Sequence, residues 1–505
     1  MTSVPTTVDL LIVGGGINGT GIARDAAGRG LKVLLCEQHD LAQHTSSASS
    51  KLVHGGLRYL EQYEFRLVRE SLAEREVLLR AAPHIVHPMR FVMPHVPALR
   101  PAWMIRVGLF LYDYLARRDT LPDSNSIDLR AAPYHHGLKP GLTKGFIYSD
   151  CWVDDARLVI ANARAAADLG ATILTRTTCV TAQRVGTQWR VTLQPDGAAP
   201  QQVTSRALVN VAGPWAKQFI NKNIHLDTPF KLKLVKGSHI VVPRLYEGEH
   251  AFILQNDDRR VVFVYPYEGR YTLVGTTDVE HTGEPGACAA SSEEIDYLCR
   301  AANRYFARKT TANDVVWRYC GMRPLFDDGA TNVSEVTRDY TLRVDGDTQN
   351  APVLSVFGGK ITTYRKLAEH ALEKLADWFP EMKAPWTEQA YLPGGALDGV
   401  SFEAYLAQLI TAYRELTPVL LRALVFRHGD AAPAVLNGAH ITADLGQHFG
   451  HTLYAREVDY FMANEWATTA DDILWRRTKC GLHLNPQQKQ ALAEYVTIKR
   501  NTAVR

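Results

Sequence analysis

The sequence of 505 residues lacks the strong net charge of nucleic-acid-binding proteins and the cysteine spacing of zinc-binding proteins. Its formal net charge of +3 gives no reason to expect a nucleic-acid partner. Its seven cysteines form no CxxC pair and no cluster with histidine at zinc-ligand spacing. We therefore expect buried, reduced thiols, no bound metal and the cytoplasmic location that such cysteine usage indicates.

Long hydrophobic runs and targeting segments are also missing. No apolar stretch reaches the length of about eighteen residues that crosses a bilayer, so we expect no transmembrane segment. Residues 1–7 lack a basic region followed by an apolar core, and we expect no signal or transit peptide. A hydrophobic content of 46% can fill a large core, and the length is typical of roughly two to four domains.

The first forty residues carry a dinucleotide-binding pattern. A predicted strand over 8–13 runs into a glycine-rich turn, which lets a pyrophosphate approach the main chain at a helix N-terminus. A second predicted strand, over 31–35, leads to Glu37, whose carboxylate can bind both ribose hydroxyls and would repel the 2′-phosphate of NADP. This pattern alone leaves NAD and FAD open. The predicted cofactor ligands here are Gly14, Gly15, Gly16, Asn18, Gly19 and Glu37.

Later turns extend the predicted cofactor site. The run 45–50 offers hydroxyls for phosphate and ring contacts, with a polar surface loop as its alternative, and the glycines at 55–56 let the main chain pass a flat ring. A second glycine turn follows a predicted strand at 207–211, and a third opens a predicted helix at 361–375. The residues predicted to contact the cofactor are Thr45, Ser46, Ser47, Ser50, Lys51, Leu52, His54, Gly55, Gly56, Val180, Gly213, Trp215, Gly358, Gly359, Lys360, Ile361 and Thr362.

Several longer blocks of sequence resemble a known family. The first reads SSASSKLVHGGLRYLEQYEFRLVRESLAERE, and a later one reads FGGKITTYRKLAEHALEKL. Together they closely resemble the FAD-dependent glycerol-3-phosphate dehydrogenases, most of all the bacterial aerobic, quinone-reducing type, over essentially the whole chain. The blocks lie at 46–76, 148–163, 236–243, 275–280, 321–325, 337–342, 357–375 and 467–479.

The resemblance and the residue patterns predict a chain of mixed α/β and α+β class. Strand–helix–strand alternation is typical of a doubly wound parallel sheet, here a Rossmann-like FAD-binding domain of the glutathione-reductase and glycine-oxidase type. Runs of β-branched residues predict an antiparallel-sheet substrate domain, and helical spacing near the end predicts an all-helical C-terminal domain. The predicted boundaries are 1–80 with 145–228 and 335–377 for FAD, 81–144 and 229–334 for substrate, 378–399 for a linker and 400–505 for the helical domain.

The resemblance also implies an activity. Hydride would pass from C2 of sn-glycerol 3-phosphate to N5 of non-covalently bound FAD, giving dihydroxyacetone phosphate, and the electrons would continue to a quinone. The implied location is the cytoplasmic face of the inner membrane, with its lipid surface as a partner, and a homodimer is left open. The alternatives are an oxidase that uses oxygen, a flavin-binding protein without turnover, and a nicotinamide dehydrogenase. A partner with iron–sulfur clusters is disfavoured, because the tail lacks extra cysteines.

A phosphorylated substrate calls for cations, and the planar fork of arginine binds phosphate through paired hydrogen bonds. By resemblance, the substrate-binding residues are Arg58, Tyr59, Arg323, Arg338 and Lys360, and Arg323 also counts as catalytic.

For the base that takes the hydroxyl proton, we predict His239, on a strand of the substrate domain. His54 is the rival catalytic histidine, although its expected task is to hold the flavin ring. A lysine, a carboxylate or water remains a further alternative.

The segment 97–118 predicts a helix with two readings. Trp103, Val107, Phe110 and Tyr114 form one apolar stripe beside basic residues, which suits an anionic bilayer surface. The opposite side is apolar as well, which is typical of a helix buried between domains. The sequence pattern leaves both readings open, and the resemblance to a peripheral membrane enzyme favours the lipid surface.

Overall fold

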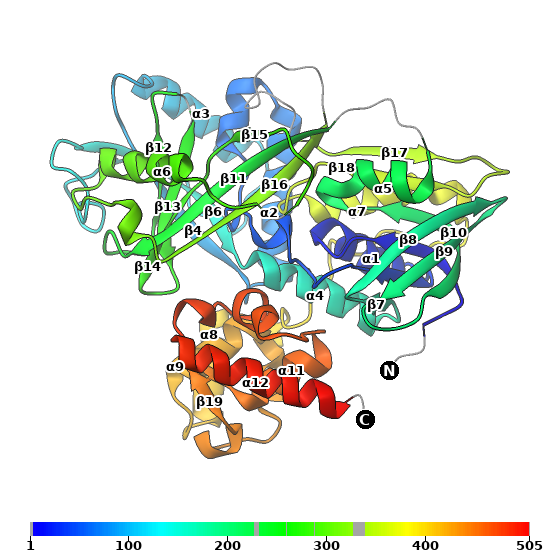
Figure 1. Ribbon diagram of the computed structural model, residues 1–505. Helices are drawn as coiled ribbons and strands as arrows, with labels where there is room; N and C mark the ends of the chain where they lie inside the picture. Colours follow the sequence, from blue (N-terminus) through cyan, green and yellow to red (C-terminus); the bar gives the residue numbers. More distant parts are fainter. Residues whose placement is uncertain (1–3, 227–231, 259, 287, 327–338, 504–505) are drawn as a thin grey trace.

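The structure is a computed structural model that describes residues 4–503, apart from 227–231, 259, 287 and 327–338 and the side chains of residues 58 and 62. Two sheets lie side by side, and a helical domain near the C-terminus packs below them (Figure 1).

The first sheet is the predicted doubly wound sheet. Its strand order is β17-β18-β10-β1-β2-β7, and all neighbours from β18 to β7 run parallel. The antiparallel strands β8 and β9 form a meander with β10. Its strands are β1 (Thr7–Val13), β2 (Val33–Cys36), β7 (Thr172–Leu174), β8 (Thr177–Val185), β9 (Gln188–Pro195), β10 (Gln201–Asn210), β17 (Thr341–Asp345) and β18 (Val353–Phe357).

Three helices pack together against this sheet, and their apolar faces share its core. They are α1 (Ile17–Gly28), α4 (Asp155–Asp168) and α7 (Tyr364–Glu373). Asp154 caps α4, as the sequence predicts, because its side chain accepts the N–H of Arg157 at 3.1 Å. Helix α7 begins three residues later than expected, since residues 361–363 form a turn that faces the cofactor cleft.

The second sheet is larger and mostly antiparallel. Its order is β15-β11-β14-β13-β12-β4-β6-β3, with β16 paired to β11 and β5 to β6. The strands are β3 (Leu52–Val53), β4 (Val86–Pro94), β5 (Asn125–Asp128), β6 (Lys144–Val153), β11 (Leu232–Pro243), β12 (Ala251–Gln255), β13 (Val261–Tyr267), β14 (Tyr271–Gly275), β15 (Val279–His281) and β16 (Trp317–Phe326).

Helices cover both faces of this second sheet. On one face, α6 (Ser292–Tyr305) begins with a capping box between Ser291 and Glu294 and packs into the core there. On the other, α2 (Phe65–Ala81) and α3 (Ala102–Tyr114) share a core with β13 and β14. One expectation is corrected here: residues 145–153 were placed in the FAD-binding domain, but β6 pairs with β4 along its whole length.

Helix α3, within segment 97–118, has one buried face and one exposed face. Ile105, Leu109 and Tyr112 are buried against the second sheet. The predicted stripe lies on the opposite side and is exposed, with 69% of Trp103 and 55% of Phe110 accessible to solvent. None of the helices in the described part of the chain is both long and apolar enough to cross a membrane.

The C-terminal domain is helical apart from one small hairpin. Its segments are α8 (Phe402–Ala412), α9 (Pro418–His428), α10 (Ala432–Leu436), β19 (His448–Gly450), β20 (Leu453–Tyr454), α11 (Ala455–Asn464), the π-helical turn η10 (Asp472–Arg477) and α12 (Pro486–Ala503). The predicted linker 378–399 runs past α1 of the first sheet, where the N–H of Lys383 donates to the carbonyl of Arg29 at 3.1 Å, and past the end of α2, where the N–H of Leu392 donates to the carbonyl of Ala81 at 2.8 Å.

The cysteines differ from expectation in one respect. Cys288 and Cys320 form a disulfide, with their Cα atoms 5.9 Å apart, whereas the other five cysteines are free and buried. The loop after β15 brings Cys288 beside β16, and a separation of 32 residues offers no spacing motif from which this contact could be predicted.

Candidate active site

A long cleft lies between the two sheets. It consists of two joined cavities of about 350 and 240 Å³, which share Ile17, Ser46, Pro324 and the glycines 358–359 on their walls. The first cavity lies over the glycine turn of β1, and the second lies against the larger sheet. The cleft therefore runs from the dinucleotide-binding unit to the substrate side.

The close packing of the main chain in the turn after β1 requires glycine. Gly14 has a φ of +124°, and a Cβ on Gly19 would lie 1.9 Å from the carbonyl oxygen of Gly14. The Oγ of Ser46 accepts the N–H of Ile17 at 3.0 Å, which ties the run 45–50 to the start of α1. The main chain is thus exposed to the cleft at the N-terminus of α1, where a pyrophosphate binds favourably.

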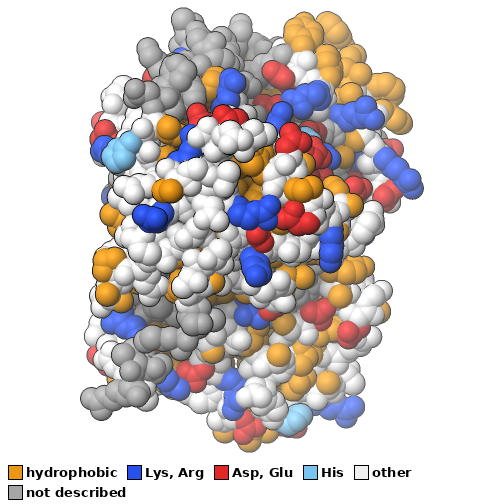
Figure 2. Space-filling model, turned by 90° about the vertical axis from the view of Figure 1, so that its right-hand side faces the viewer, with side chains coloured by type: hydrophobic (Ala, Val, Ile, Leu, Met, Phe, Trp, Pro, Cys, Tyr) orange, Lys and Arg blue, Asp and Glu red, His pale blue; other side chains and the backbone are white. Residues whose placement is uncertain are grey.

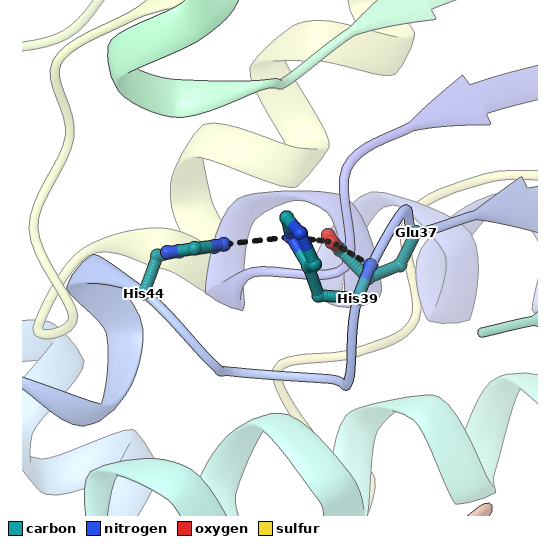
Figure 3. A group of neighbouring side chains, drawn as sticks. All are labelled: Glu37, His39 and His44. Carbon is teal, nitrogen blue, oxygen red and sulfur yellow. Dashed lines mark hydrogen bonds and ion pairs between the residues drawn. The ribbon is translucent and has the colours of Figure 1, made fainter. Parts of the chain in front are cut away.

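Glu37 lines the first cavity. Its side chain lies next to those of two histidines (Figure 3). Its carboxylate accepts the N–H of Gly15 at 2.7 Å and the N–H of His39 at 2.8 Å. His39 lies between Glu37 and His44, with Nδ1 of His39 3.0 Å from Nε2 of His44.

These three residues bring possible metal ligands within 4.8 Å of one another. We nevertheless assign Glu37 to the cofactor, because it stands where the dinucleotide-binding unit requires a ribose ligand. The prediction that no metal binds stays a prediction.

The residues present fit an FAD. The cleft is continuous, and Oδ1 of Asn18, buried in it, has no hydrogen-bond partner among the described residues. The amide of Asn18 also donates to the carbonyl of Gly358 at 3.2 Å, which joins the first glycine turn to the third. The predicted cofactor residues on the cleft walls are Gly14, Gly15, Gly16, Asn18, Glu37, Thr45, Ser46, Ser50, Leu52, His54, Gly56, Gly213, Trp215, Gly358, Gly359, Lys360, Ile361 and Thr362.

Two cations meet at the substrate end. Arg323, on β16, forms an ion pair with Asp278 and donates to Oγ1 of Thr276 at 3.4 Å. Nζ of Lys360 lies 3.9 Å from the centre of the Tyr59 ring. All of these residues line the same cavity, so a ligand there can reach both cations as well as the carboxylate that orients Arg323.

The two predicted catalytic histidines occupy different places. His54 lines the second cavity, with its ring 6.0 Å from that of Phe263. His239 is fully buried, and its Nε2 lies 2.9 Å from Oγ of Ser50, a residue of the cavity wall. Burial lowers the pKa of His239 well below its usual range, and Arg323 and Lys51 act in the same direction, so its ring is neutral at pH 7.

The remaining predicted residues lie elsewhere. The side chain of Val180 is 42% exposed, and Cys179 lines the cleft beside it. Lys51 is buried in an ion pair with Asp155 at 2.7 Å, and Oγ of Ser47 donates to the carbonyl of His44. Gly55 donates its N–H to Tyr112 rather than facing the cleft. Arg58 lies in the turn η2 (Leu57–Gln62), its side chain outside the described part, and Arg338 lies outside the described residues.

Sequence reasoning missed two groups that the structure brings to the site. Asp278 holds Arg323, although its block GTTDVE was noted only for the resemblance. Asp150 also lines the second cavity and accepts hydrogen bonds from Tyr112 and Arg75, each at 2.8 Å. Asp278 follows the end of β14, which was an available signal, whereas Asp150 lies inside β6, where no such signal marks it.

Comparison with known proteins defines the class of this site. Residues 9–365 match the model of the FAD dependent oxidoreductases, and residues 385–502 match that of the C-terminal domain of alpha-glycerophosphate oxidase. The chain is an FAD-dependent oxidoreductase, and FAD is its cofactor.

Individual relatives narrow the class. A glycerol-3-phosphate dehydrogenase of Pseudomonas aeruginosa is 53% identical over 97% of this chain and 94% of its own length. The aerobic glycerol-3-phosphate dehydrogenase of Escherichia coli is 50% identical, with 97% of each chain covered. A D-erythritol 1-phosphate dehydrogenase of Brucella abortus is 51% identical over 97% of this chain and 98% of its own.

A solved structure agrees with these relatives. The X-ray structure of the Bacillus halodurans glycerol-3-phosphate dehydrogenase complexed with FAD superposes with a TM-score of 0.73 at 25% identity, covering 97% of this chain and 94% of that one. The chain belongs to the family of FAD-dependent glycerol-3-phosphate dehydrogenases.

Proposed function

We propose that the protein oxidises the secondary alcohol of sn-glycerol 3-phosphate to the ketone of dihydroxyacetone phosphate. Bound FAD supplies the chemistry of a two-electron acceptor. The observation that carries the proposal is that Arg323 and Lys360 share one cavity with His54 and the glycine turn 358–359. That cavity offers cations for a phosphate and a proton acceptor for an alcohol beside the cofactor cleft.

The two cations have different tasks. Asp278 and Thr276 orient the guanidinium of Arg323, whose planar fork can bind two phosphate oxygens at once. Lys360 is a compact charge that lies over the Tyr59 ring. We expect Arg323 to set the position of the phosphate and Lys360 to add attraction. The resemblance also assigns Arg58 to the substrate pocket and Arg338 to the neighbourhood of the phosphate, and these two assignments stay proposals.

We place the proton acceptor at His54, because its ring lines the cavity. His239 is the alternative: it would take the proton through the hydroxyl of Ser50. In single-turnover experiments, His54→Asn should slow flavin reduction more than His239→Asn, with FAD retained in both. The opposite order would assign the role to His239.

We further propose that the protein works on an anionic lipid surface and passes its electrons to a quinone. The exposed stripe of α3 supports this, because helices that lie in a membrane interface bury such a face beside basic residues. Arg117, just beyond α3, is 90% exposed. Figure 2 shows hydrophobic side chains gathered at the upper right of the molecule, with Lys and Arg side chains close by.

Vesicle binding tests the surface. Wild-type enzyme should co-sediment with phosphatidylglycerol vesicles, and the double variant Trp103→Ser with Phe110→Ser should lose most of this binding. Val419→Ser is the control, since Val419 is 68% exposed but lies in the C-terminal domain. Equal binding of the wild type and the double variant would contradict the assignment.

The reaction is tested by anaerobic titration of the flavin spectrum. Glycerol 3-phosphate should bleach the flavin, and a soluble quinone analogue should then restore the spectrum faster than air does. Rapid reoxidation in air would indicate an oxidase, the activity named in the C-terminal family model.

The same titration tests the substrate. D-erythritol 1-phosphate should be titrated separately, because a 51% identical relative is a D-erythritol 1-phosphate dehydrogenase. If only this longer substrate bleached the flavin, it would replace glycerol 3-phosphate. No bleaching by either would refute the proposed reaction.

A further inference from the structure

The run after Glu37 forms much of the cleft wall. We call residues 38–51 the cradle loop, because Gln43, Thr45, Ser46 and Ser50 all line the cavities. The loop contains no α-helix and no strand, only the short 3₁₀ turn η1 (Thr45–Ser47). Its shape therefore depends on contacts with other parts of the chain.

The beginning of the loop is tied to the C-terminal domain by buried charges. Asp40 is 1% exposed. Its carboxylate accepts Nε of Arg476 at 2.5 Å and Nη2 of Arg477 at 2.9 Å. Arg476 also contacts Asp472, one turn earlier in η10. A buried carboxylate without these cations would be strongly destabilising, so this end of the loop is stable only with η10 in place.

The end of the cradle loop contacts the C-terminal domain indirectly, through two neighbouring carboxylates. Lys51 pairs with Asp155, which also accepts the hydroxyl of Ser49 at 2.8 Å. The neighbouring carboxylate, Asp154, binds Nζ of Lys479 at 2.9 Å. Lys479 follows η10 by two residues, so the same short stretch of the tail reaches both ends of the loop.

A row of aromatic rings makes a third connection. Trp475 stacks on Trp317 at 4.8 Å between ring centres, and Trp317 lies 4.9 Å from Tyr319. Tyr319 stacks on His239 at 4.7 Å, and His239 bonds Ser50 on the cradle loop. Ring contacts and ion pairs therefore join the tail to the loop independently.

We propose that residues 472–479, which we call the brace segment, position the cradle loop for FAD, so that the C-terminal domain completes the cofactor site. Arg476 and Arg477 are positioning residues, because they act on the loop and do not line the two cavities that we assign to FAD. The inference rests on that assignment of FAD to the cleft and not on the identity of the substrate.

The test is the affinity of FAD for Asp40→Asn, measured by the release of flavin fluorescence on dilution of the holoenzyme. Loss of the charge that Arg476 and Arg477 hold should loosen the loop, and we expect FAD to bind at least about tenfold more weakly. The visible spectrum of the flavin that remains should shift, because its surroundings have changed. No substrate is present, so failure of the proposed reaction would leave this result unaffected.

Arg164→Gln is the matched control. Arg164 also bridges the two domains, through a 2.9 Å bond from Nη1 to the carbonyl of Asn464, but it has no hydrogen bond to the cradle loop. The control should shift the thermal midpoint of unfolding and leave FAD affinity within about twofold. Equal FAD affinity and equal spectra in Asp40→Asn and wild type would overturn the proposal.

Arg476 provides a second route if Asp40→Asn does not fold. The side chain of Arg476 is 11% exposed, and Arg477 still pairs with Asp40 when Arg476 is replaced. Arg476→Gln should weaken FAD binding, and Arg476→Lys should restore part of it because the charge is retained. Equal FAD affinity in wild type, Arg476→Gln and Arg476→Lys would also overturn the proposal.

Discussion

The main chain around the cofactor cleft is supported from two sides by different chemistry. The brace segment holds the cradle loop directly through the ion pairs of Arg476 and Arg477 with Asp40. Lys479 of the same segment pairs with Asp154, next to the Asp155 that binds Lys51 of the loop. The turn at His54 and Gly55 is held by α3, where Tyr112 accepts the N–H of Gly55 at 2.7 Å and donates to Asp150 at 2.8 Å.

The two supports shift the pKa of their carboxylates in opposite directions. Burial would raise the pKa of Asp472, but Arg476, the N–H of Thr468, Arg477 and Arg176 lower it to about 2. Burial raises the pKa of Asp150 to about 6, because Arg75 and the hydroxyl of Tyr112 only partly oppose it. Three arginines and a main-chain N–H outweigh burial at Asp472, whereas one arginine and two hydrogen-bond donors do not outweigh it at Asp150.

The largest effect should come from a residue outside both supports. Arg323→Ala removes the cation nearest the proposed phosphate position, and we expect KM for glycerol 3-phosphate to rise by about a hundredfold with FAD retained. Steady-state kinetics measure this. Arg318→Ala, an exposed arginine on the same strand, is the control. A KM within a factor of about three of wild type would remove Arg323 from phosphate binding.

Of the two supports, weakening the ion pairs of the brace segment should reduce stability more. The pKa of Asp472 is lowered in the folded state, so its contribution to stability is present above pH 4 and is lost as pH falls towards 2. Asp472→Asn should therefore destabilise the protein by about 2 kcal/mol at pH 7.

Thermal unfolding checks this value. Asp459→Asn is the control, because Asp459 pairs with Lys499 on the surface of the same domain. If both variants lost equal stability, the ionic support would be no stronger than a surface pair.

Weakening the hydrogen bonds of Tyr112 to Gly55 and Asp150 should cost less stability. Tyr112→Phe leaves the N–H of Gly55 without its short bond at the cavity wall, at a cost of about 1–2 kcal/mol. Flavin reduction by substrate should slow, while FAD stays bound. Tyr114→Phe on the same helix, with its side chain 69% exposed, serves as the control. Equal reduction rates would show that α3 does not influence the turn.

The smallest effect is a pH dependence. Because the pKa of Asp150 is raised in the folded state, its contribution to stability is present below pH 4 and is lost as pH rises through 6. Relative to wild type, Asp150→Asn should gain about 1 kcal/mol between pH 5 and pH 7. Denaturant unfolding at these two values measures the change. A constant difference would place the pKa of Asp150 outside this range.

Local patterns predict the parts of this molecule that are built from nearby residues. The strand over 8–13, its glycine turn and Glu37 follow from their spacing, and FAD is confirmed as the cofactor. The brace segment was quoted only as part of the resemblance, because no periodicity links Asp40 to Arg477. The disulfide was missed for the same reason. Cys288 lies in a loop and Cys320 in β16, and the two come together only after the sheet has formed.

Asp40 and Arg477 are separated by 437 residues. A ribosome would therefore have finished nearly the whole chain before this ion pair could form. On our proposal, the FAD site of the nascent chain is incomplete until the brace segment has been synthesised. Binding of FAD is then one of the last steps of maturation. Chains that end before the brace segment would then stay colourless, so a yellow colour would report that synthesis has passed residue 479.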